Sequence, residues 1–114
     1  MSFNPNSVIA ETALTLAAGV ATLIPAFLML GSTKWVLVIK NTGASTIGTC
    51  LTKKYVHEAD TNPGPDTNLD GKIAPLTSGS SVTVEATDVA YEKISFTLTS
   101  SSGTTITYSF EGRV

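Results

Sequence analysis

The feature that most constrains the fold is an apolar run, TALTLAAGVATLIPAFLML, at residues 12–30. No charged residue lies between Glu11 and Lys34, so a helix over this run would be long enough to cross a hydrocarbon core of about 30 Å. Such a helix would hold Pro25 in its interior, where proline removes a backbone hydrogen bond and clashes with the preceding turn. Clusters of Lys and Arg, which flank many membrane helices, are missing on both sides. The run therefore favours two strands of a β-domain.

The side-chain period within the run predicts how these two strands lie. Leu14 and Leu16 share one face of the first strand, and the second strand alternates in the same way up to Ile24. The AAG sequence between them is typical of a turn. We therefore expect a hairpin whose second strand ends at Pro25. A helix over residues 12–33, buried in the protein or lying in a membrane, is the alternative.

The remainder of the chain predicts strands more plainly, because β-branched and aromatic residues alternate with polar ones. Proline, glycine and short polar stretches separate these segments. The expected strands cover residues 34–41, 47–56, 80–87, 91–99 and 104–112. The side chains expected to point inward are Trp35, Leu37, Ile39, Val82, Val84, Ala86, Ile94, Phe96, Leu98, Ile106, Tyr108 and Phe110.

Six to eight short strands at regular spacing, with no helix, are typical of an antiparallel β-sandwich or jelly roll. We therefore expect an all-β fold. A chain of 114 residues corresponds to one domain, so the sandwich is expected to cover residues 1–114. Residues 1–7 contain one large apolar side chain, Phe3, and are expected to form an extended N-terminal arm that a neighbouring subunit orders.

The charge composition argues against nucleic acid as a partner. Charged residues make up 14% of the chain, and seven basic residues are scattered among nine acidic ones. Binding through phosphate neutralisation needs clustered Lys and Arg. The first residues carry no positive charge ahead of an apolar core, so they do not predict a Sec-type signal peptide. We expect synthesis in the cytoplasm.

The residue types that usually carry catalysis are scarce. His57 is the only histidine and Cys50 the only cysteine, and their odd separation along one strand would place them on opposite faces. The sequence has no nucleophile elbow, phosphate-binding glycine loop or HExxH motif. We expect a buried cysteine, a solvated histidine and no enzymatic activity. With a single cysteine, no disulfide forms within the chain.

One stretch of the long polar loop over residues 57–79 matches part of a calcium-binding pattern. In the sequence DTNLDG, Asp66, Asn68 and Asp70 occupy oxygen-ligand positions of a calcium loop. The twelfth position of the pattern, normally a bidentate glutamate, is a threonine here. We expect an exposed turn without a metal or other cofactor, and weak calcium binding by these three residues is the alternative.

Five segments carry the layout of the chain: the leader MSFNPNS, VIAETALTLAAGVATLIP, KWVLVIKNTGAS, APLTSGSSVTV and the closing strand TITYSFEG. In this layout the chain resembles the small β-sandwich decoration or cement proteins of tailed-phage heads. The resemblance implies a virion protein on the capsid exterior that binds the major capsid protein and reinforces its lattice. It also implies association with copies of itself, commonly as homotrimers, and no membrane partner.

Apolar residues in excess of the needs of a small core are expected to contact other chains. Four candidates follow Pro25 in the apolar run and do not show strand alternation: Phe27, Leu28, Met29 and Leu30. Phe3, in the N-terminal arm, is a fifth candidate. Self-association and contact with a capsid lattice are the roles that we expect for these residues.

Two other functions stay open. A carbohydrate- or receptor-binding module of a phage or bacterial surface would use Trp35, Tyr55 and Tyr91 together with the loop over residues 57–79. A small membrane-associated virion protein would use residues 12–33 as a helix.

Overall fold

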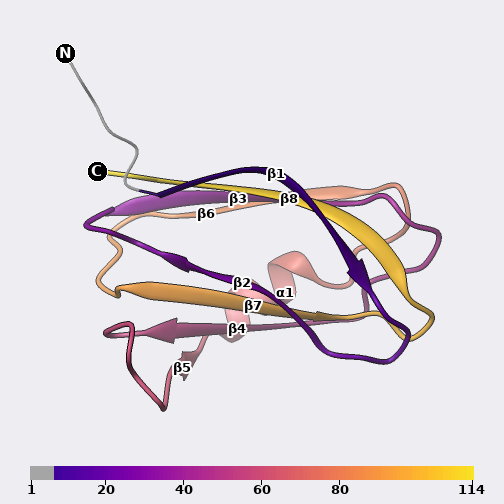
Figure 1. Cartoon of the computed structure of the whole chain (residues 1–114), viewed down its shortest axis with the longest axis horizontal. Coiled ribbons are helices and arrows are strands. Elements are labelled where there is room, and N and C mark those ends of the chain that lie inside the picture. Colours follow the sequence, from indigo (N-terminus) through magenta and orange to yellow (C-terminus); the bar gives the residue numbers. More distant parts are fainter. Residues whose placement is uncertain (1–6) are drawn as a thin grey trace.

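Two antiparallel sheets of four strands each pack face to face in the computed structural model of the protein, which describes residues 7–114 (Figure 1). Sheet A has the strand order β1-β8-β3-β6, and sheet B has the order β2-β7-β4-β5. This arrangement confirms the predicted all-β sandwich. The elements are β1 (Ser7–Leu16), β2 (Thr22–Leu28), β3 (Lys34–Asn41), β4 (Thr49–Tyr55), β5 (Gly64–Pro65), α1 (Thr67–Ile73), β6 (Ser81–Ala86), β7 (Lys93–Thr99) and β8 (Thr104–Arg113).

The core lies between the two sheets and is filled by alternate residues of their strands. Val82 and Ala86, on the edge strand β6, are half-buried and pack against it. Aromatic rings meet within it, where Phe27 stacks on Phe110 with ring centroids 4.0 Å apart. The other predicted inward side chains are all buried: Trp35, Leu37, Ile39, Val84, Ile94, Phe96, Leu98, Ile106, Tyr108 and Phe110.

The predicted hairpin between the first two strands is wrong. β1 pairs with β8 in sheet A, whereas β2 pairs with β7 in sheet B. Residues 17–21 carry the chain from one sheet to the other through Gly19, which has a φ of 71° and donates its N–H to the Ser100 carbonyl at 2.9 Å. Placing the strands in different sheets buries Leu16 on one wall of the core and Ile24 on the other.

β2 also continues past Pro25, where the prediction ended it. Its ladder with β7 shifts register between Ile24 and Phe27, and β2 is an edge strand. Proline is tolerated at bulges and on edge strands because no ladder hydrogen bond is needed from it there. A helix over residues 12–33 is equally wrong, because this segment forms β1, β2 and the turns after them. In residues 7–114, no helix is both long enough and apolar enough to span a membrane.

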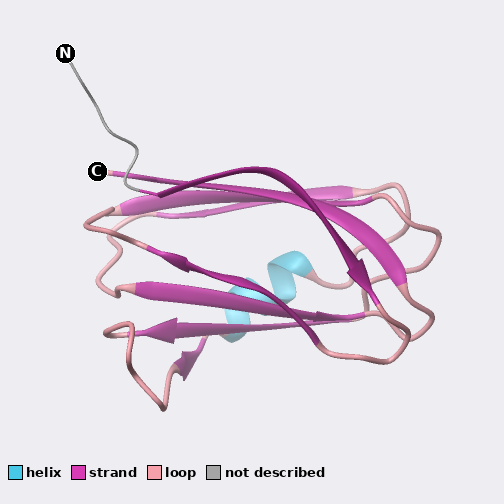
Figure 2. Ribbon diagram, viewed as in Figure 1, coloured by secondary structure: helices cyan, strands magenta, loops and turns pink. Residues whose placement is uncertain are grey.

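The loop predicted over residues 57–79 contains a helix, α1, that the sequence did not predict. Asp66 caps its N-terminus by accepting a hydrogen bond from the Leu69 backbone N–H at 3.1 Å. Leu69 and Ile73, one helical turn apart, are buried. α1 packs beside β4 and β6, between the two sheets (Figure 2). This part of the loop therefore completes the core.

Candidate functional site

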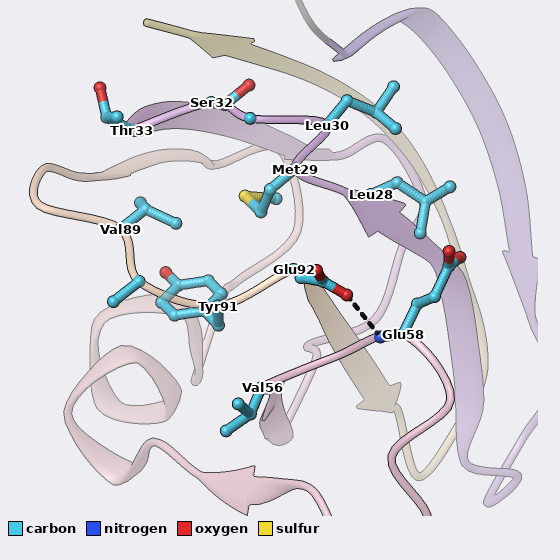
Figure 3. Close-up of a pocket in the computed structure, with 12 residues that line it drawn as sticks. Leu28, Met29, Leu30, Ser32, Thr33, Val56, Glu58, Val89, Tyr91 and Glu92 are labelled. Carbon is cyan, nitrogen blue, oxygen red and sulfur yellow. Dashed lines mark hydrogen bonds between the residues drawn. The ribbon is translucent and has the colours of Figure 1, made fainter.

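An open hollow lies at the end of the sandwich where the β2–β3 turn, the end of β4 and the loop before β7 meet (Figure 3). Its volume is about 470 Å³. We call this region the end hollow. The lining residues that matter most for its chemistry are Leu28, Leu30, Val56, Glu58, Tyr91 and Glu92.

A tight turn between β2 and β3 forms one rim of the end hollow. The Ser32 backbone N–H donates to the Met29 carbonyl at 2.8 Å, and both residues between them have positive φ, 50° at Leu30 and 84° at Gly31. Positive φ at both central positions is the pattern of a type I′ turn, which favours Asn, Asp or Gly. Leucine is therefore an unfavourable residue at position 30. Burial does not explain it, because 62% of the Leu30 surface is exposed.

The opposite rim of the end hollow has an exposed apolar residue, and hydrogen bonds fix the wall beside it. Val56, just beyond β4, is 69% exposed. Behind it, the Trp35 indole N–H donates to the Tyr91 hydroxyl at 2.8 Å. A Glu92 carboxylate oxygen accepts a hydrogen bond from the Glu58 backbone N–H at 3.1 Å (Figure 3). The end hollow therefore combines two exposed apolar rims with a hydrogen-bonded wall.

The four residues predicted to contact other chains are divided between the core and the surface. Phe27 and Met29 are only 3% and 1% exposed, which corrects the prediction for these two, since core side chains offer no contact surface. The physical reason is that strand alternation resumes after the bulge in β2. Leu28 is half-buried and Leu30 exposed, and both line the end hollow. Phe3 lies outside the described residues.

The residues considered for catalysis and for glycan binding are engaged elsewhere. Cys50 lies in the core, where burial raises the pKa of its thiol to about 12, so the thiol stays protonated at neutral pH. His57 lies in the exposed turn after β4. The Trp35 ring is buried in the core, and Lys93 Nζ lies over the Tyr55 ring, 4.3 Å from its centroid. These aromatic rings therefore do not form an exposed platform for a sugar.

The two carboxylates of the calcium-like pattern, Asp66 and Asp70, make contacts that stabilise the fold. Besides capping α1, Asp66 pairs with Lys54 at 2.7 Å, and the Lys54 ammonium holds the pKa of the Asp66 carboxyl below its ordinary value. An Asp70 carboxylate oxygen accepts a hydrogen bond from the Thr52 backbone N–H at 2.6 Å, which ties α1 to β4. Asn68 is exposed. In the described part of the chain, no three His, Cys, Asp or Glu side chains gather closely enough to hold a metal ion.

Millimolar calcium is therefore expected to leave the melting temperature of the protein unchanged. Binding would require Asp66 to give up Lys54 and the helix cap, and a loop without the bidentate glutamate would bind only in roughly the 10⁻⁴–10⁻³ M range. Differential scanning fluorimetry with and without calcium measures this. A calcium-dependent rise in melting temperature that is present in the wild type and absent in an Asp66→Ala variant would contradict the expectation.

Comparison with known proteins bears on the fold. No protein-family model matches the sequence, and no curated protein matches it either. Among solved structures, the SPBc2 prophage-derived protein YomS is similar, with a TM-score of 0.50 and 15% identity, over 89% of this chain and 91% of that chain. A de novo designed double-stranded β-helix has a TM-score of 0.39 and 14% identity, over 90% of this chain and 97% of that chain. A protein of Bacillus endospore appendages, which form disulfide-linked pili, has a TM-score of 0.37 and 10% identity, over 100% and 97%.

The likeness to YomS relates this sandwich to the fold of a prophage-derived protein. At 15% identity it concerns the backbone arrangement alone. The chemistry of the end hollow is therefore argued from the residues of this chain.

Proposed function

We propose that this chain is a non-enzymatic structural protein of a phage particle, which binds the capsid exterior and stabilises the lattice of the major capsid protein. Two observations support the proposal independently. The fold is similar to that of a prophage-derived protein, and the layout of the sequence resembles that of phage decoration proteins. The end hollow adds a surface suited to a protein contact, because its exposed rims, Leu30 and Val56, are apolar.

The conformation of Leu30 is the observation that carries the proposal. A left-handed backbone costs a residue with a Cβ roughly 1–2 kcal/mol, and a side chain that is mostly exposed gains little by burial in return. Strained backbone of this kind is concentrated at binding and switch regions. We infer that Leu30 inserts into an apolar recess of the capsid protein. The neighbouring carboxylates of Glu58 and Glu92 then match lysine or arginine side chains around that recess.

Leu30→Asn separates this function from the fold. Asparagine adopts positive φ more readily than leucine, so the variant is expected to melt at or above the temperature of the wild type. Its affinity for capsids is expected to fall at least about tenfold, which corresponds to about 1.4 kcal/mol. Co-sedimentation with empty capsids of the phage whose genome encodes the chain measures this affinity.

Leu51→Asn is the matched control, because Leu51 is a leucine of similar exposure that lies on β4, away from the end hollow. This variant is expected to bind capsids as the wild type does. A wild type that does not sediment with capsids would contradict the proposed function. Loss of binding in Leu51→Asn with normal binding in Leu30→Asn would instead assign the attachment to the outer face of sheet B.

A further inference from the structure

We propose that the free edge of β1 pairs with β1 of a second copy, so that two sandwiches share one continuous sheet. This contact is separate from the end hollow and goes beyond the proposed attachment to capsids. Backbone N–H and C=O groups at a sheet edge accept another strand, and proteins protect such edges with proline, charge, bulges or short length. The partner that fits an unprotected sheet edge is therefore another extended strand.

Among the four edge strands of the described residues, β1 is the longest, and its residues 12–16 carry no proline, charge or bulge, although β2 approaches part of β1. β5 has two residues and ends in Pro65, and β2 carries Pro25 at a bulge. β6 has six residues, includes Glu85 and lies beside α1. β1 has ten residues and contains neither proline nor lysine. A bulge interrupts β1 near its start and leaves residues 12–16 in regular pairing with β8.

The register of sheet A identifies the backbone groups of β1 that face outward. The Thr42 N–H donates to the Thr105 carbonyl at 2.9 Å. Because hydrogen-bonded pairs alternate along an antiparallel ladder, odd-numbered residues of β8 bond to β3 and even-numbered ones face β1. Leu14 lies opposite an even-numbered residue, whereas Ala13 and Thr15 lie opposite odd-numbered ones. The N–H and C=O groups of residues 13 and 15 therefore point away from β8, to a side where no described strand pairs with β1.

A second copy of β1 satisfies these groups without bringing like charges together. In an antiparallel pair centred on Leu14, Ala13 of each copy lies opposite Thr15 of the other, and these residues form the hydrogen-bonded pairs. Glu11, the one charged residue of β1, lies beyond this stretch and pairs with Lys40 of its own chain at 3.2 Å. The half-buried Leu14 side chains meet at the axis and cover each other.

The surroundings of the edge favour a neutral partner such as this same strand. Residues 12–33 contain no charged side chain, so pairing two copies along this edge desolvates no charge in the run. Antiparallel pairing of two identical strands has two-fold symmetry. The contact therefore predicts a dimer, in place of the homotrimer that the resemblance implied.

Light scattering of the purified full chain tests the pairing. At high concentration the wild type is expected at twice its monomer mass of 11.8 kDa, and dilution is expected to return it to the monomer. Ala13→Pro removes an outward N–H and places a ring on the free edge without removing a hydrogen bond to β8. It is expected to raise the dissociation constant of the dimer at least about tenfold, or about 1.4 kcal/mol.

Thr83→Pro, on the edge strand β6, is the matched control. The Asn41 N–H donates to the Ser80 carbonyl, and alternation from that pair gives Thr83 an outward N–H as well. This variant is expected to dimerise as the wild type does. The proposal is overturned by a wild type that stays at 11.8 kDa, by assembly of three chains, or by equal loss of pairing in both variants.

A cross-link tests the register even where a proline variant fails to fold. Opposed Cα atoms of a non-hydrogen-bonded pair lie about 4.5 Å apart, which is within reach of a disulfide. Leu14→Cys is expected to form a disulfide between two chains under mild oxidation. Val82→Cys, at the corresponding half-buried position of β6, and the wild type with its buried Cys50 are expected not to. Equal cross-linking in both variants, or none through residue 14, overturns the pairing and leaves the capsid measurement unaffected.

Discussion

Phe27→Ala is expected to lower the free energy of unfolding by about 3–5 kcal/mol, the usual cost of emptying a buried phenylalanine site. The Phe27 ring is stacked parallel to that of Phe110, with centroids 4.0 Å apart. It also meets the Phe96 and Tyr108 rings at 6.1 and 6.2 Å. Phe27 comes from sheet B, and Phe110 and Tyr108 come from sheet A. The substitution therefore removes an aromatic contact that joins the two walls of the core.

Urea denaturation of the wild type and the variant measures this loss. Leu30→Ala is the control within the same apolar segment, and it is expected to change the free energy of unfolding by less than about 0.5 kcal/mol. Equal losses in the two variants would mean that Leu30 is also part of the core. A small loss in Phe27→Ala would contradict the alternation that buries this residue after the bulge.

Asn41→Ala is expected to lower the free energy of unfolding by about 3 kcal/mol, because removal of this buried side chain leaves several polar partners without a hydrogen bond. Asn41 is 1% exposed. Its Nδ2 donates to the Ser45 carbonyl at 2.7 Å and the Leu76 carbonyl at 3.0 Å. Its Oδ1 accepts from the Thr104 hydroxyl at 2.8 Å. One side chain thus joins the ends of β3 and β8 to the segment after α1.

The same denaturation experiment measures this effect, with Asn68→Ala as the matched control. Asn68 is exposed on α1, so its replacement is expected to change stability by less than about 0.5 kcal/mol. The Gly43 backbone N–H also donates to Asn41 Oδ1, at 3.3 Å. A loss below about 1 kcal/mol in Asn41→Ala would show that water or a rearranged loop replaces the hydrogen bonds of this side chain.

Strand positions and core faces were predictable because their signal is local. Period-two alternation over residues 91–99 and 104–112 depends only on neighbouring residues, and β7 and β8 cover nearly the same ranges. Strand pairing was not predictable in this way, because β1 pairs with β8 and β2 with β7 across most of the chain. The short AAG connection favoured a local hairpin, but the core gains more when Leu16 and Ile24 lie on opposite walls.

The helix α1 escaped prediction because its evidence in the sequence is slight. Seven residues present only two buried apolar side chains, Leu69 and Ile73, within a stretch whose prolines and acidic residues are typical of a loop. Asp66, which caps α1, is a residue type that favours both helix N-caps and turns. The calcium pattern and the helix cap use the same side chain, and only the fold distinguishes them.

The candidate site was predictable in part. Composition identified residues 27–30 as an apolar excess, but the exposed members depend on the bulge at Pro25. Val56 and Leu30 line the same hollow, but 26 positions separate them in the sequence, so only the fold shows that they are neighbours. The unfavourable leucine at position 30 could not be recognised from the sequence, because the positive φ of Leu30 and Gly31 is known only from the structure.

Quantitative mass spectrometry of purified phage particles tests whether the chain is a structural component of the capsid exterior. Under the proposed function, particles of the phage that encodes the chain are washed, dissociated and digested, and copies of the chain are counted relative to the major capsid protein. A structural protein of the capsid exterior is expected in a fixed ratio to the capsid protein that survives washing, and this ratio is expected to fall when the gene carries Leu30→Asn. Recovery of the chain only at the level of soluble host proteins, with intact particles, would contradict the proposed function.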